Sequence, residues 1–246
     1  MKIGIVGMGV VGKALSEYYR RASHHVWTYD KACDTTLELL VLNRSAEIVF
    51  ICVNTPGQES GPLDCGNVWD AVGSLVGSKT VIIKSTVNPG VTDEIQVAFP
   101  MHRVLFLPEF LSADSAFHDY ANPRRPHIFG VPSGQERFMG DLVNLLPEWK
   151  DVGARILDAK QAELLKLATN TFYAFKVAFA NALCYVDMTQ ETLSALAEDP
   201  WIVASHFTLD WKGSRRGIGG CCLPKDFKAL LAYDEKDGRE GNLAHL

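Results

Sequence analysis

Apolar runs separated by amphipathic stretches dominate the first part of the chain. Short, uninterrupted apolar runs are typical of buried strands, and the stretches between them have helical character. The predicted strands cover residues 1–6, 26–29, 47–53, 80–84, 103–107 and 127–130. The predicted helices cover residues 13–19, 37–43, 68–76, 91–98 and 135–146. Strands that alternate with helices imply an α/β fold with a Rossmann-like, doubly wound parallel sheet.

The pattern changes near residue 158, where a long apolar stretch begins. Residues 159–188 contain neither glycine nor proline, which predicts one long helix. We therefore predict two domains, a Rossmann-like domain over residues 1–155 and a smaller all-helical domain over residues 156–246. Lys166 and Asn170 are four residues apart and share a face of the long helix. They either bind a substrate oxygen or belong to a polar stripe on a half-exposed helix.

A glycine pattern lies between the first strand and the first helix. The stretch from Gly7 to Gly12, Gly-Met-Gly-Val-Val-Gly, is the dinucleotide fingerprint in its strand–turn–helix context. Gly7 permits the tight turn, Gly9 lets a pyrophosphate approach the backbone, and Gly12 allows close packing of helix and strand. The backbone amides at the helix N-terminus, including those of Val10 and Val11, are suited to holding the phosphate.

The second strand ends at an acidic residue, Asp30. A carboxylate in this position accepts hydrogen bonds from both ribose hydroxyls and repels a 2′-phosphate, so we expect NAD to be preferred over NADP. Polar residues also follow three later strands, at Thr55, Thr86 and Glu109. Because ligands bind beyond the carboxyl ends of parallel strands, these side chains are expected to face one crevice. Each could instead be a turn or cap residue, as Ser-Thr sequences commonly are.

Near the end of the chain, a glycine-rich loop carries a cysteine. The sequence Gly217-Ile218-Gly219-Gly220-Cys221-Cys222-Leu223-Pro224-Lys225-Asp226 places Cys222 just before a predicted helix that has Pro224 in its first turn. A thiol beside a helix N-terminus and a lysine is expected to have a lowered pKa, as a nucleophile requires. The alternative is a buried structural cysteine.

Composition excludes several other classes of protein. The chain has 246 residues, a net charge of −5, 47% hydrophobic and 22% charged residues, which is typical of a globular protein without affinity for nucleic acid. No apolar stretch is long enough for a signal peptide or a membrane span, so we expect a soluble, cytoplasmic protein. Its six cysteines form no CxxC pair and lack a histidine cluster, so no metal site is expected.

Taken in order, these motifs resemble the UDP-glucose/GDP-mannose dehydrogenase family over nearly the whole chain. The segments that carry the resemblance are GMGVVG, VFICVNTP, IIKSTVNPG, LPEFLSADSA, ELLKLATNTF and GIGGCCLPKD, together with Asp30. Enzymes of this kind oxidise the C6 alcohol of a nucleotide sugar to a carboxylate with two NAD. Their fold comprises a Rossmann-like domain, a central helical domain that makes the dimer, and a third domain that completes the nucleotide-sugar site.

The resemblance implies a role for each matching residue. Cys222 would attack the intermediate aldehyde, Lys166 and Asn170 would stabilise the reacting oxygen, and Asp226 would orient or deprotonate a water or the thiol. Glu109 and Thr86 would position the hydrolytic water, with Glu109 a possible base. Further residues that would line the NAD pocket are Val53, Asn54, Thr55 and Thr86. Those that would contact the sugar nucleotide are Glu109, Phe110, Leu111, Lys166, Asn170, Gly217 and Gly219. The resemblance also implies a homodimer.

The sequence departs from the family pattern in four places. The sequence ends soon after Asp226, so we expect the third domain to be absent. The segment between Asp30 and Glu47 is short, so a smaller sheet is expected. The arginine that the family places near Asp199 is absent there, where Trp201-Ile202-Val203 stands. The loop Ser112-Ala113-Asp114 lacks the family's usual residues. These departures put substrate recognition in doubt.

Three hypotheses compete on this evidence. The first is an active, compact nucleotide-sugar dehydrogenase, which retention of the cysteine, lysine, asparagine and both carboxylates favours. The second is a 3-hydroxyacid or 6-phosphogluconate type dehydrogenase, which Cys222 disfavours because those enzymes need no cysteine. The third is an incomplete NAD-binding subunit, or a fragment, whose missing nucleotide-binding domain is supplied in trans.

Overall fold

The computed structural model describes most of the chain. It covers residues 1–59, 61–134, 146, 149–183, 186, 188–199, 202, 218 and 220–235. The chain divides into two compact units, which are described separately. The first comprises Met1–Pro56 and Asp64–Leu165, and the second comprises Gly57–Leu63 and Lys166–Leu246. The domain boundary near residue 155 stays a prediction.

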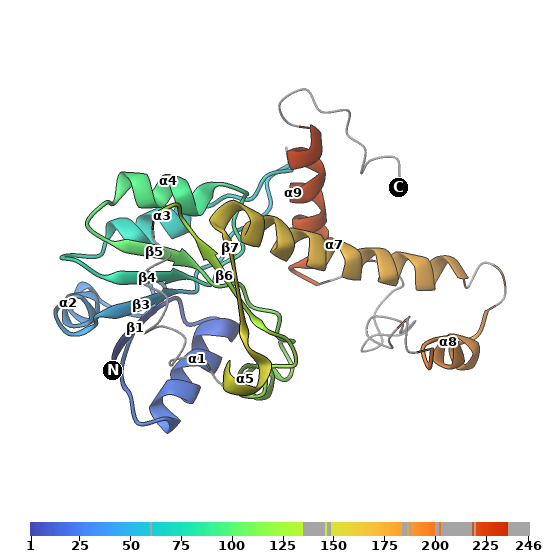
Figure 1. Cartoon of the computed structure of the whole chain (residues 1–246), viewed down its shortest axis with the longest axis horizontal. Coiled ribbons are helices and arrows are strands. Elements are labelled where there is room, and N and C mark those ends of the chain that lie inside the picture. Colours follow the sequence, from blue (N-terminus) through green and yellow to red (C-terminus); the bar gives the residue numbers. More distant parts are fainter. Residues whose placement is uncertain are drawn as a thin grey trace. The chain divides into compact units, whose positions relative to one another are not determined.

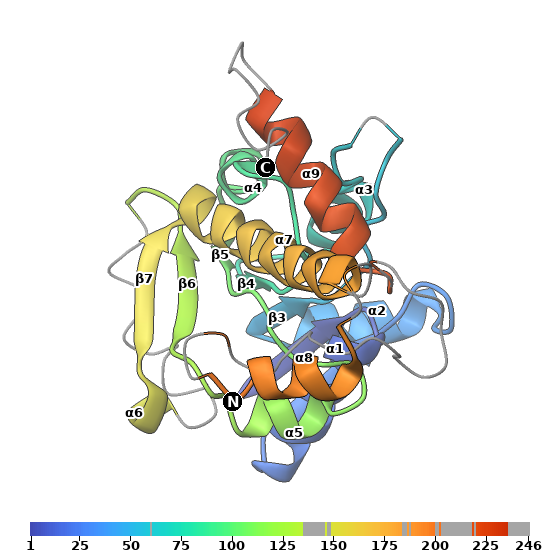
Figure 2. The same ribbon diagram turned by 90° about the vertical axis from the view of Figure 1, so that its right-hand side faces the viewer.

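The first unit is built on a sheet that has seven strands within the described residues, in the order β2-β1-β3-β4-β5-β6-β7. The strands are β1 (Lys2–Val6), β2 (His25–Tyr29), β3 (Ile48–Ile51), β4 (Thr80–Ile83), β5 (Arg103–Phe106), β6 (His127–Val131) and β7 (Ala154–Asp158). Neighbouring strands are parallel except β5 and β6, which are antiparallel with Phe106 opposite Gly130. Figure 2 shows β6 and β7 side by side. The predicted α/β class is thus confirmed, and β7 is an addition to the predicted strands.

Helices cover both faces of this sheet, as a doubly wound fold requires. In Figure 1, α1 and α5 lie on one face, and α3 and α4 lie on the other. The helices of this unit are α1 (Val10–Arg21), α2 (Thr36–Ser45), α3 (Gly66–Gly73), α4 (Val91–Ala98), α5 (Ala116–Ala121) and the short α6 (Trp149–Val152). Sequence reasoning missed α5 and α6. The helix predicted over 135–146 lies outside the described residues except for Leu146.

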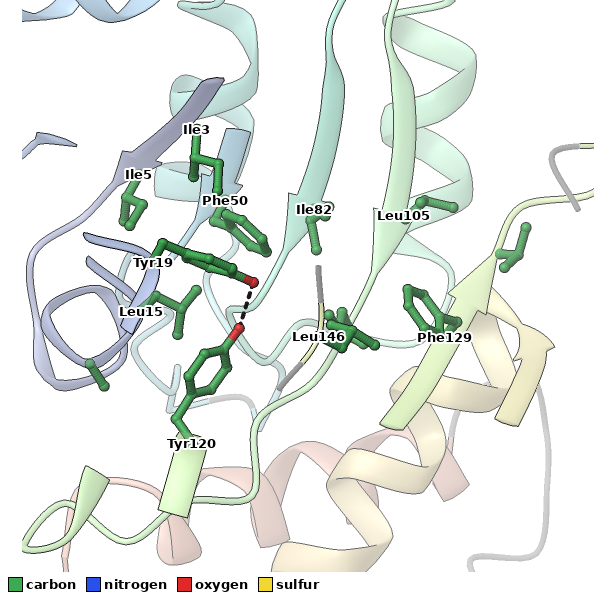
Figure 3. Packing of buried hydrophobic residues seen from close by; sticks show 13 residues of the cluster. Ile3, Ile5, Leu15, Tyr19, Phe50, Ile82, Leu105, Tyr120, Phe129 and Leu146 are labelled. Carbon is green, nitrogen blue, oxygen red and sulfur yellow. Dashed lines mark hydrogen bonds between the residues drawn. The ribbon is translucent and has the colours of Figure 1, made fainter. Parts of the chain in front are cut away.

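A buried aromatic cluster joins helices α1 and α5 to the sheet. The hydroxyl oxygens of Tyr19 and Tyr120 are 2.7 Å apart, and the Tyr19 ring stacks on Phe50 with 5.3 Å between ring centroids. Figure 3 shows the two hydroxyls facing each other within the apolar core. Burial raises the pKa of both phenols, so both stay protonated and satisfy each other's polar atoms. This core supports the loops that leave the carboxyl ends of the strands.

The second unit contains most of α7 (Ala159–Leu183), with α8 (Gln190–Leu196) and α9 (Leu223–Glu235). Helix α7 is described as far as Leu183, and residues 184, 185 and 187 of its predicted extension to residue 188 lie outside the described residues. Helix α9 crosses α7 (Figure 1), and a loop, Gly57–Leu63, packs on α9. A Cβ at Gly61 would lie 2.7 Å from that of Ala232, and the φ of Gly61 is +103°, so both contact and conformation require glycine. Among the described residues, none of the helices has the length and apolarity needed to cross a membrane.

Helix α4 has a buried carboxyl group as its cap. One Glu163 oxygen accepts a hydrogen bond from the Gly90 backbone N–H at 2.5 Å, and the other accepts from the Thr92 N–H and hydroxyl at 2.9 and 2.6 Å. Burial outweighs these hydrogen bonds and raises the pKa of Glu163 to about 7. Since α4 directly follows the loop that carries Thr86, Glu163 helps to fix that loop.

The raised pKa of Glu163 predicts a pH-dependent stability. The folded state favours the protonated carboxyl, so the stabilisation is complete below pH 4.5 and is lost as the pH rises through about 7. We expect the free energy of unfolding to fall by about 3 kcal/mol over this range. Glu163→Gln cannot titrate and should lack this decrease. Urea unfolding of both proteins from pH 4 to 8 measures the difference, and parallel pH profiles would contradict the assignment.

Candidate active site

Two glycines of the fingerprint are required by the fold itself. Gly7 has a φ of +93°, and a Cβ there would lie 2.6 Å from the carbonyl oxygen of Cys52. A Cβ at Gly12 would lie 1.9 Å from the carbonyl oxygen of Gly7, which leaves no room for any side chain. These contacts hold the strand β1, the turn and helix α1 together, as the sequence predicted.

Gly9 differs from its two neighbours in the motif. A Cβ at Gly9 would meet no protein atom within 4 Å, and its backbone lies in the ordinary extended region. Gly9 is the N-cap residue of α1 and offers no side-chain hydrogen bond, so the first amides of the helix, including those of Val10 and Val11, are open to a ligand. The fold does not require this glycine, whereas the close approach of a phosphate does.

The carboxylate of Asp30 lies beside this turn. Its Oδ2 accepts a hydrogen bond from the Met8 backbone N–H at 2.7 Å, and its Oδ1 accepts one from the Ala32 N–H at 2.9 Å. These hydrogen bonds lower the pKa of Asp30, so it is ionised at neutral pH. Each oxygen keeps a second lone pair for a ribose hydroxyl. The glycine turn, the helix N-terminus and Asp30 together fit a dinucleotide with a free 2′-hydroxyl.

The polar residues after β3 and β4 come together because these strands are parallel neighbours. The Thr55 hydroxyl donates to the Thr86 carbonyl oxygen at 2.7 Å, and the Ser85 hydroxyl donates to the Val53 carbonyl oxygen at 2.7 Å. The Asn54 side chain accepts a hydrogen bond from the Asn67 amide at 3.0 Å. Hydrogen bonds therefore link the predicted pocket residues that follow β3 to those that follow β4.

Glu109, after β5, forms an ion pair with Lys84, which directly follows β4. The Lys84 side chain is 1% exposed and that of Glu109 is 16% exposed, and the Lys84 ammonium lies 5.6 Å from the Tyr120 ring centroid. A buried carboxylate needs such a partner to stay charged. Sequence reasoning missed Lys84, although a lysine that closes an otherwise apolar strand was a signal for it. Next to Glu109, the Phe110 ring stacks under the Arg125 guanidinium at 3.6 Å, and Leu111 packs against the hydrophobic core.

The second unit holds the other group of candidate residues. The Lys166 ammonium donates to Asn170 Oδ1 at 3.2 Å, and the Asn170 amide donates to Asp226 Oδ2 at 2.6 Å. The Lys225 ammonium donates to Asp226 Oδ1 at 2.6 Å. Asp226 is fully buried, and Asn170 and Lys166 are nearly so. The structure therefore joins the predicted pair on α7 to the predicted carboxylate on α9, and it adds Lys225 to the cluster.

Cys222 immediately precedes α9, and its carbonyl oxygen accepts the Asp226 backbone N–H at 3.0 Å. The prediction of a lowered pKa is wrong. Partial desolvation raises the pKa of the Cys222 thiol, and the neighbouring Cys221 and Asp226 raise it further. Lys225 lowers it, but the charge of Lys225 is largely matched by Asp226. Cys222 is nevertheless exposed, as a nucleophile must be.

Two candidate positions fall outside the described residues, Gly217 and Gly219. The same holds for Trp201 and Val203, where the sequence departs from the family pattern. Within the part of the chain that the structure describes, no group of three or more His, Cys, Asp or Glu side chains could hold a metal ion.

Comparison with known proteins decides the family. Residues 34–143 match the NAD-binding domain of the UDP-glucose/GDP-mannose dehydrogenase family, and residues 160–245 match its central domain. The chain belongs to this family. The match agrees with the resemblance in the motifs and disfavours the 3-hydroxyacid type of dehydrogenase.

Individual relatives support the same assignment. The UDP-glucose 6-dehydrogenase of Campylobacter jejuni is 35% identical over 68% of this chain and 42% of its own length. YtcA of Bacillus subtilis is 28% identical over 96% of this chain and 64% of its own length. The structure of a UDP-glucose dehydrogenase from Pyrobaculum islandicum is 26% identical, with a TM-score of 0.79 over all of this chain and 66% of that one. The chain thus spans about two thirds or less of these relatives.

NAD is the cofactor of this family of dehydrogenases, which confirms the prediction from the fingerprint. The residues present fit it. Gly7 and Gly12 shape the turn, the α1 N-terminus with Gly9 suits the pyrophosphate, and Asp30 suits the ribose hydroxyls.

Proposed function

We propose that this protein oxidises the C6 alcohol of a nucleotide sugar, of the UDP-glucose type, to a carboxylate in two NAD-dependent steps. The observation that carries the proposal is the hydrogen-bonded cluster of Lys166, Asn170 and Asp226, one helical turn from the exposed thiol of Cys222. When bound, NAD would accept the two electrons of each oxidation step. The protein's own side chains would hold the sugar carbon and its oxygen.

Cys222 supplies the covalent step. Its thiolate adds to the aldehyde formed by the first oxidation, and the resulting thiohemiacetal keeps the intermediate on the protein. A second oxidation of the same carbon gives a thioester. Water then attacks the thioester carbonyl, the carbon–sulfur bond breaks, and the products are the carboxylate and the free thiol. The second oxidation thereby proceeds without a free aldehyde hydrate.

Lys166 and Asn170 would stabilise negative charge on the reacting oxygen. The Lys166 ammonium donates to Asn170 Oδ1, so the two side chains act as one hydrogen-bonded pair. Asp226 is better suited to orientation than to proton removal, because each of its oxygens already accepts a hydrogen bond, from Asn170 and from Lys225. These two hydrogen bonds hold the Asn170 amide and the Lys225 ammonium in place.

Glu109 and Thr86 would position the water that hydrolyses the thioester, with Glu109 as a possible base. The ion pair with Lys84 holds the Glu109 carboxylate in a fixed direction. The backbone at Phe110 and Leu111 and the loop at Gly217 and Gly219 would contact the sugar nucleotide.

Turnover of nucleotide sugars tests this proposal. The purified chain is incubated with NAD and a panel of UDP- and GDP-sugars, and reduced cofactor is followed by its absorbance. We expect NADH to form with at least one sugar, which identifies the substrate. NAD binding without turnover of any sugar would contradict the proposal.

The chain covers only part of the length of its relatives, which favours a second candidate function. The chain aligns with 64% of YtcA and 66% of the Pyrobaculum islandicum enzyme. In the second candidate function, the nucleotide-sugar site is completed by a segment that corresponds to the unaligned part of these relatives. In this function the chain is an NAD-binding unit that becomes active only with that part. Turnover that appears only after addition of a relative's C-terminal domain would favour this candidate.

We also propose a homodimer through α7. Phe172 and Phe175 are 59% and 54% exposed, and Phe175 stacks with the exposed Phe179 at 6.3 Å, so large aromatic rings follow one another along the helix. Such an exposed apolar patch is typical of an interface. Phe175→Glu is expected to shift the protein from dimer to monomer in sedimentation analysis. Glu191→Lys on the separate helix α8 is a matched surface control, and a wild-type monomer would contradict the proposal.

A further inference from the structure

Cys222 has a second thiol beside it. Cys221 and Cys222 are both exposed, and their sulfur atoms are 3.6 Å apart. Both precede α9, and only the Cys222 carbonyl oxygen takes part in its hydrogen bonding, by accepting the Asp226 backbone N–H. Gly220, directly before them, has a φ of +82°, and a Cβ there would meet nothing within 4 Å. The space beside Gly220 is therefore open.

The two thiols influence each other's ionisation. The charge of Cys221 and its hydrogen bond to Cys222 both raise the pKa of the Cys222 thiol. The Cys222 thiol is therefore held in its protonated form by a charged neighbour, which gives a thiolate next to a protonated thiol. This is the combination that disulfide formation requires, because one sulfur is oxidised as a thiolate and the other then attacks it.

We propose that Cys221 and Cys222 form a reversible disulfide with each other when a peroxide oxidises the protein, and that this removes the Cys222 nucleophile. In the first step a thiolate attacks hydrogen peroxide, the O–O bond breaks, and a sulfenic acid and hydroxide form. In the second step the neighbouring thiol attacks the sulfenic sulfur, the S–S bond forms and water leaves with the thiol proton. The two thiols lose two electrons in total, and the peroxide is reduced to two waters.

Geometry makes this disulfide easy to reduce. Adjacent Cα atoms across a trans peptide are about 3.8 Å apart, which is shorter than the roughly 4.4 to 6.8 Å usual for a disulfide. The ring closed by neighbouring cysteines is strained, and strained, exposed disulfides have the higher reduction potentials of regulatory sites. Cys221 thus protects Cys222, because a lone sulfenic acid is open to irreversible further oxidation.

Formation of the disulfide between Cys221 and Cys222 does not depend on the proposed dehydrogenase function. The effect of the disulfide on turnover rests on that function. The full chain is treated with hydrogen peroxide, trapped with iodoacetamide and analysed by intact-protein and peptide mass spectrometry. Iodoacetamide should label all six cysteines of the reduced chain but only four after peroxide treatment. The peptide that contains Cys221 and Cys222 should then be about 2 Da lighter than the same peptide with two free thiols, because the disulfide lacks two hydrogens. Dithiothreitol should restore all six.

Two substitutions serve as matched controls. Cys221→Ser cannot form the disulfide and is expected to gain oxygen on Cys222 instead, in steps of about 16 Da that dithiothreitol does not fully reverse. Cys33→Ser removes another exposed thiol and should behave like the wild-type chain. Oxygen addition to Cys222 in the wild-type chain, or a disulfide that includes Cys33, would overturn the proposal.

Turnover provides a separate readout of the consequence. Peroxide should abolish nucleotide-sugar oxidation by the wild-type chain, and dithiothreitol should restore it, whereas Cys221→Ser should lose it permanently. If the mass change appears but the reduced chain oxidises no nucleotide sugar, the proposed function fails and the disulfide stands. If turnover is normal and survives formation of the disulfide, the regulatory role is overturned.

Discussion

Replacement of Cys222 by serine is expected to lower the rate of sugar-acid formation by at least about a thousandfold. A serine hydroxyl is not ionised at neutral pH and adds poorly to an aldehyde, so the covalent intermediate is not held for the second oxidation. The rate is measured as acid formed per enzyme, with NAD affinity measured separately by calorimetry. NAD affinity should not change.

Cys221→Ser is the matched control, since it makes the same substitution one residue away. Its turnover should stay within about tenfold of the wild-type rate, because Cys221 has no role in the proposed covalent step. The raised pKa of Cys222 adds a pH signature: alkylation of Cys222 by iodoacetamide should accelerate as the pH increases from 7 to 9. Normal acid formation by Cys222→Ser would exclude covalent catalysis at this residue.

Alanine at Gly12 should destabilise the fold and alanine at Gly9 should not, whereas both substitutions should weaken NAD binding. At Gly12 a Cβ would lie 1.9 Å from the Gly7 carbonyl oxygen, so helix α1 must shift. We expect a loss of about 3 kcal/mol in the free energy of unfolding, with loss of NAD binding. At Gly9 a Cβ meets no protein atom, so stability should not change.

The Gly9→Ala variant separates the cofactor site from the fold. Its Cβ occupies the space through which a pyrophosphate approaches the α1 N-terminus, so NAD affinity should fall at least about tenfold. Thermal unfolding and NAD titration of both variants provide the comparison. Wild-type NAD affinity in Gly9→Ala would show that the cofactor does not approach this turn.

Local patterns predicted the sheet well because buried parallel strands have uninterrupted apolar sequences. Such a pattern could not predict that β6 runs antiparallel to β5, since side-chain alternation is the same in either direction. Strand β7 was missed because its residues are half-exposed and directly precede a long helix. The loop Gly57–Leu63 gave no sign that it belongs with α9, because that association arises only from tertiary packing.

Residues of the site were predictable to different degrees. Helical spacing placed Lys166 and Asn170 on one face, but the hydrogen bond from Asn170 to Asp226, 56 positions further along the sequence, was not predicted. The pKa of Cys222 was predicted in the wrong direction because the sequence shows neither the partial burial of the thiol nor the pairing of Lys225 with Asp226.

The ratio of NADH formed to sugar consumed tests the central claim most directly. The chain is given excess NAD and a limiting amount of its nucleotide sugar, and NADH and sugar acid are quantified at completion. The account predicts two NADH and one carboxylate for each sugar. One NADH for each sugar, with a free aldehyde or ketone as the product, would contradict the four-electron oxidation at Cys222.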